Sequence, residues 1–178
     1  MLEKFCLNEK IELRIIQDDD FKDLFNLIDK NRLFLTKWLP WVDFTNTESD
    51  SKAFIDISKQ DFKNKKSIQY AIIYENNLVG MFGLNEINMR NKSVSFGYWL
   101  GEQYQGKGII TSVCEYIKNY IFLNENIHRI EIRADEGNIK SRSIPERLNF
   151  KLEGILKDAD WIDGHYENVC IYSLINEY

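Results

Sequence analysis

The chain has 178 residues and no repeat or linker, so we expect a single domain over residues 1–178 with a substantial hydrophobic core. Its 44% hydrophobic and 29% charged residues are typical of a folded globule and exclude a disordered or fibrous chain. The net charge of -5 argues against nucleic acid as a partner, because phosphate binding depends mainly on Lys and Arg.

Residues 1–63 are predicted to contain one strand and two helices. Alternating apolar residues predict a strand over 11–15, and apolar residues at helical spacing predict helices over 21–28 and 51–63. The acidic triplet 18–20 directly precedes the first helix, so we expect it to provide the N-cap. Between the two helices, the segment 33–41 is rich in aromatic residues.

The remainder of the chain, from residue 69 onward, is predicted to be mostly strands. A hairpin is expected at Asn76-Asn77, because Asn tolerates a positive φ in a tight turn. Antiparallel strands come first and a strand–helix–strand unit follows, which predicts an α+β fold with a mixed, mostly antiparallel sheet and helices on both faces. The expected strands cover 69–74, 78–84, 94–100, 129–134, 150–158 and 166–174, and the expected helices cover 108–122 and a short segment ending near Leu148.

A glycine-rich loop joins the strand 94–100 to the helix 108–122 and contains Gly106-Lys107-Gly108. The N–H groups at a helix N-terminus lack intrahelical partners, and glycine lets the backbone approach a ligand closely, so this junction suits a phosphate. It is neither a P-loop nor a complete dinucleotide fingerprint. The alternative interpretation is a tight strand-to-helix turn, and these residues alone favour neither.

The spacing Gln103-x-x-Gly106-x-Gly108 resembles the acetyl-CoA signature of the GNAT N-acetyltransferase superfamily. The surrounding sequence is most similar to the branch that acetylates the N-terminal serine or alanine of ribosomal proteins. One departure is Asn149, where the family usually has Gly; Asn is the next-best residue for the left-handed end of a helix. The segments that carry the likeness are 38–41, 97–100, 105–110, 138–141 and 148–154.

The resemblance implies the GNAT fold and acetyl-CoA as co-substrate, with no metal. It implies that the strand 94–100 diverges from the strand 129–134, which frees backbone groups to pair with the pantetheine arm as an added strand would. The cofactor-binding residues implied in this way are Trp99, Leu100, Gln103, Gln105, Gly106, Lys107, Gly108, Ile109 and Asn138.

Acetyl transfer from a thioester to an amine needs a base for the amine proton and benefits from a proton donor to the leaving thiolate. By family position the base is Asp160, one methylene shorter than the usual glutamate, beside Trp161, whose ring can desolvate the carboxylate. Ser141 is the expected donor. The alternatives are that Asp160 is a solvated hairpin residue, that Glu167 is the base, and that Ser141 or Asn138 only caps a helix.

By the same resemblance, Trp38 and Trp41 line the substrate site; the alternative is that both rings belong to a satellite core. The implied acceptor is the N-terminal α-amine of a protein such as a ribosomal protein, and the resemblance is compatible with a homodimer. A polyamine or aminoglycoside acceptor and a non-catalytic acyl-CoA-binding module stay open. Three widely spaced cysteines and the lack of a long apolar run predict a cytoplasmic protein without disulfides or membrane contact.

Overall fold

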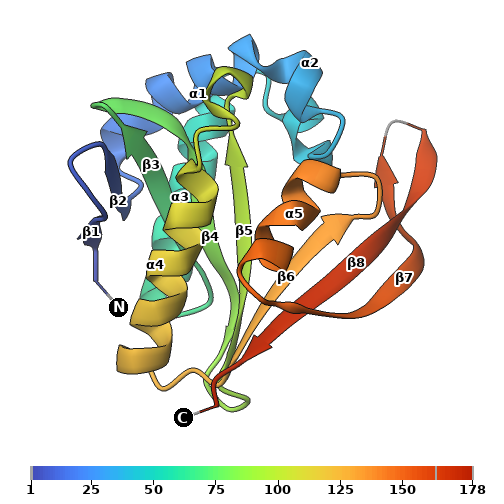
Figure 1. Ribbon diagram of the computed structural model, residues 1–178. Helices are drawn as coiled ribbons and strands as arrows, with labels where there is room; N and C mark the ends of the chain where they lie inside the picture. The colour runs from blue at the N-terminus through green and yellow to red at the C-terminus, as the bar shows by residue number, and fades with distance from the viewer. Residues whose placement is uncertain (1, 163, 178) are drawn as a thin grey trace.

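The computed structural model describes residues 2–162 and 164–177 (Figure 1). Its strands form one eight-stranded sheet in the order β1-β2-β3-β4-β5-β6-β8-β7. Among the described strands, β5 and β6 are the only parallel neighbours, which confirms the mixed, mostly antiparallel sheet. The strands are β1 (Lys4–Cys6), β2 (Ile11–Ile15), β3 (Ile68–Tyr74), β4 (Asn77–Asn88), β5 (Ser93–Leu100), β6 (Arg129–Asp135), β7 (Lys151–Ile162) and β8 (His165–Ile175).

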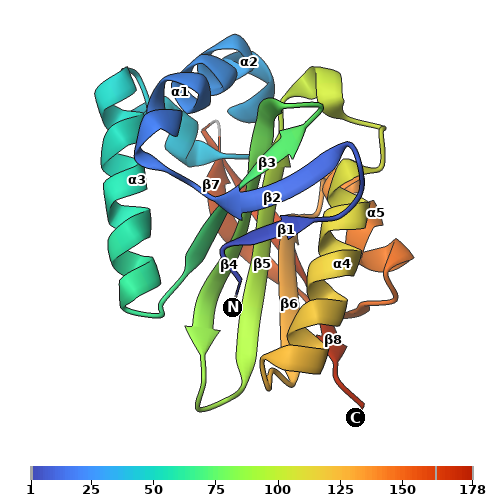
Figure 2. The same ribbon diagram turned by 90° about the vertical axis from the view of Figure 1, so that its left-hand side faces the viewer.

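Helices cover both faces of the sheet, as Figure 2 shows from the side. They are α1 (Phe21–Lys30), α2 (Arg32–Leu35), α3 (Glu48–Lys63), α4 (Ile109–Asn124) and α5 (Ile139–Arg147), with the 3-10 turns η1 (Asp18–Asp20), η2 (Pro40–Phe44) and η3 (Glu102–Tyr104). No helix in the described part of the chain is long and apolar enough to cross a membrane.

Two hydrophobic cores result from the alternation of side chains along the strands. Tyr70 and Phe82 point to the face covered by α4 and pack with its buried residues. Ala71 and Met81 point to the opposite face and pack with the buried side of α1 and α3. Both faces of the central strands are therefore buried, which holds the middle of the sheet rigid around the site.

The parallel pair β5 and β6 is hydrogen-bonded over only part of its length. Ser93 to Phe96 pair with Arg129 to Ile132, and the last four residues of β5 have no partner on β6. Figure 1 shows the two strands diverging toward the C-terminal end of β5, beside α5. This divergence confirms the expectation for the strands 94–100 and 129–134 and leaves backbone groups of Trp99 and Leu100 unpaired on that side.

The expectation that a side chain of the acidic triplet caps the first helix is wrong. Residues 18–20 form η1, and Asp20, at the N-cap position of α1, makes no side-chain cap bond there. Its buried carboxylate instead accepts two hydrogen bonds from Arg14, at 2.6 and 2.7 Å, and one from the Gln17 N–H. An adjacent guanidinium outweighed the helix dipole as the partner for this charge.

The sequence predicted the kinds of turns and helix ends correctly, but several of their positions differ by one to three residues. The hairpin turn after β3 places Glu75 and Asn76 at positive φ, so it begins one residue earlier than expected. Asn149 has a φ of 64°, the left-handed conformation expected for it after α5. Pro145 lies inside α5. The helix α3 begins at Glu48, three residues early, because Thr47 and Asp50 form a capping box.

Gly80 sets how closely β4 and β5 approach at the end of β5. It lies opposite Leu100, and a Cβ at this position would overlap the backbone carbonyl oxygen of Trp99. We expect Gly80→Ala to lower the free energy of unfolding by about 1–3 kcal/mol, because the clash is with backbone and cannot be relieved by a rotamer change. Urea unfolding measures this. Gly154→Ala on β7 is the control, since no atom lies within 4 Å of its Cβ position; equal losses in both variants would contradict the argument.

Candidate functional site

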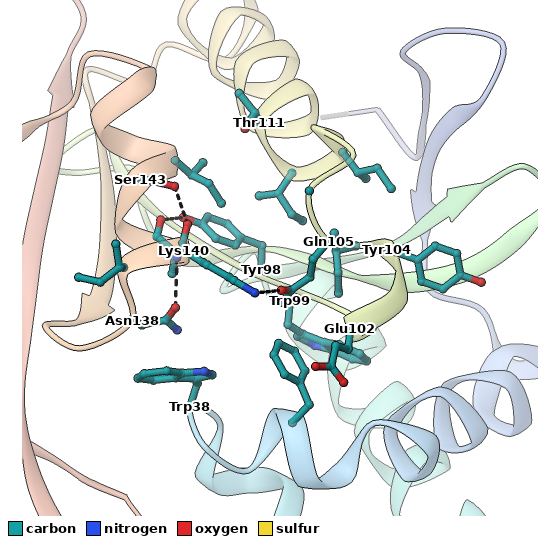
Figure 3. A pocket seen from close by; sticks show the side chains of 18 of the residues that line it. Trp38, Tyr98, Trp99, Glu102, Tyr104, Gln105, Thr111, Asn138, Lys140 and Ser143 are labelled. Carbon is teal, nitrogen blue, oxygen red and sulfur yellow. Dashed lines mark hydrogen bonds between the residues drawn. The ribbon is translucent and has the colours of Figure 1, made fainter.

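A cavity of about 930 Å³ opens where β5 diverges from β6. Its walls come from the end of β5, the loop that follows it, the start of α4, the helix α5 and the segment around α2, as Figure 3 shows from close by. Of the predicted residues, those that line the cavity are Trp38, Trp99, Leu100, Gln105, Gly106, Gly108, Ile109, Asn138 and Ser141.

The glycine loop has the geometry of an anion cradle. Gly106 and Gly108 have φ values of 71° and 74°, which side-chain-bearing residues rarely adopt. Gly108 is the N-cap of α4, and no atom lies within 4 Å of a Cβ built on either glycine, so the backbone is open to the cavity. The first N–H groups of a sixteen-residue helix therefore face a space that can hold a phosphate.

The positive charge at this cradle does not come from the lysine between the glycines. The Lys107 ammonium lies over the rings of Tyr74 and Tyr104, 5.4 and 5.2 Å from their centroids, and the residue does not line the cavity. Such contacts stabilise a cation by about 0.5–2 kcal/mol. Lys107 thus ties the loop to the end of β3, a role that sequence reasoning missed.

Two cations on α5 face the loop instead. The Lys140 ammonium donates a 2.9 Å hydrogen bond to the Gln105 side-chain carbonyl, a bridge across the cavity that is drawn in Figure 3. The Arg147 guanidinium donates to the Thr111 hydroxyl at 3.3 Å and to the backbone carbonyl of Ser143 at 2.9 Å. These residues were missed because their spacing in sequence carries no motif; the fold alone brings α5 beside α4.

The start of α5 confirms a capping role for Asn138. Its side-chain oxygen accepts a 3.1 Å hydrogen bond from the Ser141 N–H. The backbone carbonyl of Ser141 accepts from the Tyr98 hydroxyl at 3.3 Å, so β5 and α5 are joined across the cavity wall. Burial raises the pKa of Tyr98, which keeps its hydroxyl protonated and able to donate. Tyr98 was not predicted and lies in the cavity next to Ser141.

The predicted tryptophans divide into a lining residue and a supporting one. Trp38 lies in the cavity wall, with ring atoms 3.8 Å from the position of a Cβ on Gly137. Trp41 does not line the cavity; its ring packs against Trp99, with 5.8 Å between centroids. Gln103, predicted to bind the cofactor, lies in η3 and also outside the lining.

Asp160 does not line the cavity. It lies on β7 opposite Glu167 of β8, with its side chain exposed. Its carboxyl group shares a hydrogen bond with that of Asp135, the last residue of β6, which does not line the cavity either. The backbone carbonyl of Asp135 accepts from the Asn138 N–H at 2.9 Å. Asp135, and not Asp160 itself, is therefore bonded to the start of α5.

Comparison with known proteins matches residues 10–151 to the family model for the acetyltransferase (GNAT) domain. The chain is 31% identical over 170 residues to "Putative ribosomal N-acetyltransferase YdaF" of Bacillus subtilis (strain 168), covering 95% of this chain and 93% of the relative. It is 27% identical to spermidine N(1)-acetyltransferase of Vibrio cholerae serotype O1, covering 92% and 91%.

Two solved structures superpose over nearly the whole chain. One is RimL, the ribosomal L7/L12 alpha-N-protein acetyltransferase in complex with coenzyme A, with a TM-score of 0.94, 26% identity, and coverage of 97% of this chain and 98% of that one. The other is the microcin C7 self immunity acetyltransferase MccE in complex with acetyl-CoA and AMP, with a TM-score of 0.90, 34% identity, and coverage of 95% and 94%.

Asn31, a buried residue that was not predicted, fixes the start of the glycine loop. Its side-chain oxygen accepts from the Glu102 N–H at 2.9 Å, and its side-chain nitrogen donates to the Leu27 carbonyl at 2.8 Å. We expect Asn31→Leu to lower the free energy of unfolding by about 1–3 kcal/mol for each group left unpaired. Hydrogen exchange of the Glu102 amide should become faster, and NMR measures it.

The matched variant is Asn31→Asp, which keeps the acceptor for Glu102 and loses the donor to Leu27. The Glu102 amide should stay protected in this variant. Unchanged protection in Asn31→Leu would show that the loop is held by other contacts.

Proposed function

This chain belongs to the GNAT acetyltransferase family, and on that premise we propose that it transfers an acetyl group from acetyl-CoA to the N-terminal α-amine of a protein, in particular a ribosomal protein. The observation that carries the proposal is the near-complete superposition on RimL, whose name assigns it that kind of acceptor. The likeness to YdaF over 95% of this chain supports the same acceptor class.

The residues present fit acetyl-CoA. Gly106 and Gly108 leave the loop backbone open for the pyrophosphate, and Lys140 and Arg147 bring positive charge to the same side of the cavity. The divergent edge of β5 at Trp99 offers backbone groups to the amide-containing arm. Acetyl-CoA supplies the activated acetyl thioester, and the protein supplies position and proton transfer.

In the proposed reaction, the neutral amine nitrogen attacks the thioester carbonyl carbon, the C–N bond forms and the C–S bond breaks. Asp160 takes the proton that the amine loses, directly or through a water. Ser141 donates a proton to the departing thiolate and regains one from solvent, and the Tyr98 hydroxyl, which bonds the backbone carbonyl of Ser141, holds that residue in place. No covalent intermediate with the protein is needed.

A small amine is the second candidate acceptor. The 27% identity to a spermidine N(1)-acetyltransferase favours it. The acidic group of Asp135, Asp160 and Glu167 does not separate the two acceptors, because carboxylates attract any ammonium, whether it belongs to a peptide or to a polyamine. The aromatic wall at Trp38 suits a less charged, bulkier acceptor and favours the peptide.

The acceptor is tested by acetyl transfer to short peptides with a free N-terminal Ser or Ala, to the same peptides with a blocked N-terminus and an internal Lys, and to spermidine. Thiol release gives kcat/KM and mass spectrometry locates the acetyl group. We expect the free N-termini to be preferred by about tenfold or more, a difference of 1.4 kcal/mol. A higher kcat/KM for spermidine would move the assignment to the second candidate; acetyl-CoA binding without any turnover would indicate a non-catalytic module.

The proposed base is tested by Asp160→Asn. We expect kcat/KM for the peptide to fall by about 10²-fold at pH 7, because an α-amine of pKa about 7.7–8.0 is then mostly protonated and must lose its proton. The loss should shrink at high pH, where the free amine forms without assistance. Ser141→Ala is the comparison: it should cost less and show no such recovery. A loss below about threefold for Asp160→Asn would make that carboxylate a solvated hairpin residue.

A further inference from the structure

Asp135 is a buried carboxylic acid that no step of the proposed reaction uses. Only 6% of its surface is exposed, whereas the neighbouring Arg133 is exposed on the same strand. Burial, the charges of Asp160 and Glu167, and the hydrogen bond to Asp160 raise the pKa of Asp135 from 3.8 to about 6. A buried acid whose nearest partner is another acid is costly to the fold, so its presence calls for an explanation.

Strand register brings three carboxylates to one face of the sheet. Asp135 pairs with Val169, and Asp160 pairs with Glu167, which is two residues from Val169 on β8. Residues two apart on a strand point to the same side. Asp135, Glu167 and Asp160 therefore form a row across β6, β8 and β7.

This row lies on the same face as the aromatic side of the cavity. Phe96 on β5 pairs with Ile132 on β6, and both point into the core beneath α4. Counting three residues along each strand, Trp99 and Asp135 both point to the opposite face. Trp99 packs there against the core of α1 and α3. Asp135 and the exposed Asp160 therefore lie on the face of the sheet that carries Trp99, which lines the cavity.

The other charged groups around Asp135 are already engaged. Arg133 lies near Asp160 but bonds Glu131 at 2.8 Å, with Glu86 of β4 also nearby. Glu167 is 2.8 Å from the His165 ring. Glu136 accepts from the Asn168 amide at 2.7 Å. Asp160 is the group that shares a hydrogen bond with Asp135.

We propose that Asp135 is a positioning residue for the proposed base: it holds the Asp160 carboxyl against the acceptor side of the cavity and shares a proton with it. The inference rests on the proposed function, because it assumes that Asp160 accepts the amine proton. Two effects follow from one contact. A carboxyl on an exposed hairpin gains a fixed orientation, and two adjacent carboxyl groups can hold one proton between them.

The test measures the pH dependence of kcat/KM for a peptide acceptor in the wild type, Asp135→Asn and Asp160→Asn. Asn keeps the size of Asp and removes the charge, with an N–H donor in place of one acceptor oxygen. In the wild type, kcat/KM should fall more steeply with decreasing pH below about pH 6. There the carboxyl pair takes up a proton in addition to the proton on the amine. In Asp135→Asn this steepening should be lost, because the titrating carboxyl of Asp135 is gone, and kcat/KM at pH 7 should fall about tenfold with acetyl-CoA affinity unchanged.

Glu136→Gln is the matched control, since it removes one carboxylate from the adjacent position, and that carboxylate bonds Asn168. It should leave the position of the steepening unchanged. If Asp160→Asn loses activity as proposed while Asp135→Asn matches this control, the positioning role is overturned and the base assignment stands. If Asp160→Asn retains full activity, the base assignment falls and the positioning role falls with it.

A second readout does not depend on activity. Because folding raises the pKa of Asp135 above its unfolded value, this group lowers the stability of the folded state as pH rises from about 4 to about 6. Urea unfolding of the wild type and Asp160→Asn should therefore show a smaller loss over that range in the variant, where the neighbouring charge is gone. An identical loss in both proteins would show that the two carboxyls do not interact and would overturn the proposal, even if Asp135→Asn failed to fold.

Discussion

The structure depends on one interruption in its sheet: β5 and β6 pair over four residues and then separate. A sheet that loses pairing in its middle leaves backbone N–H and C=O groups without partners, which is costly unless something else satisfies them. Here the opening is flanked by a helix N-terminus on one side and by α5 on the other. The cavity, the anion cradle and the unpaired edge all follow from that separation, and a ligand with amide groups and phosphates suits all three.

The central sheet is held rigid so that this opening keeps its shape. Both faces of β3 and β4 are buried, by α4 on one side and by α1 and α3 on the other. The close contact of Gly80 with β5 fixes the strand end, and Asn31 fixes the loop that follows it. Function is thus placed on loops and strand ends, whereas the elements that position them carry most of the buried apolar surface.

The sequence predicted most helices and strands because their apolar residues recur with a clear period, whereas the short β1 and α2 were not predicted. Asn149 and Gly108 were also readable, since a left-handed conformation restricts the residue type strongly. The contacts that depend on tertiary placement were not readable. Lys107 was expected at the phosphate and lies over two tyrosines. Lys140 and Arg147 reach the cavity only because the fold places α5 across it from the glycine loop and the start of α4.

The row of carboxylates on β6, β7 and β8 is another contact that depends on tertiary placement and could not be predicted from the sequence. Asp135 and Asp160 are twenty-five positions apart in sequence, and only the β7–β8 hairpin folding back on β6 brings them together. Each carboxylate alone is an ordinary strand residue. Together, the buried Asp135 provides a fixed partner in a low-dielectric environment, and the exposed Asp160 is accessible to accept a proton. In the proposed reaction, such a base tolerates a short side chain, because the partner carboxyl, and not the length of the side chain, fixes where the charge lies.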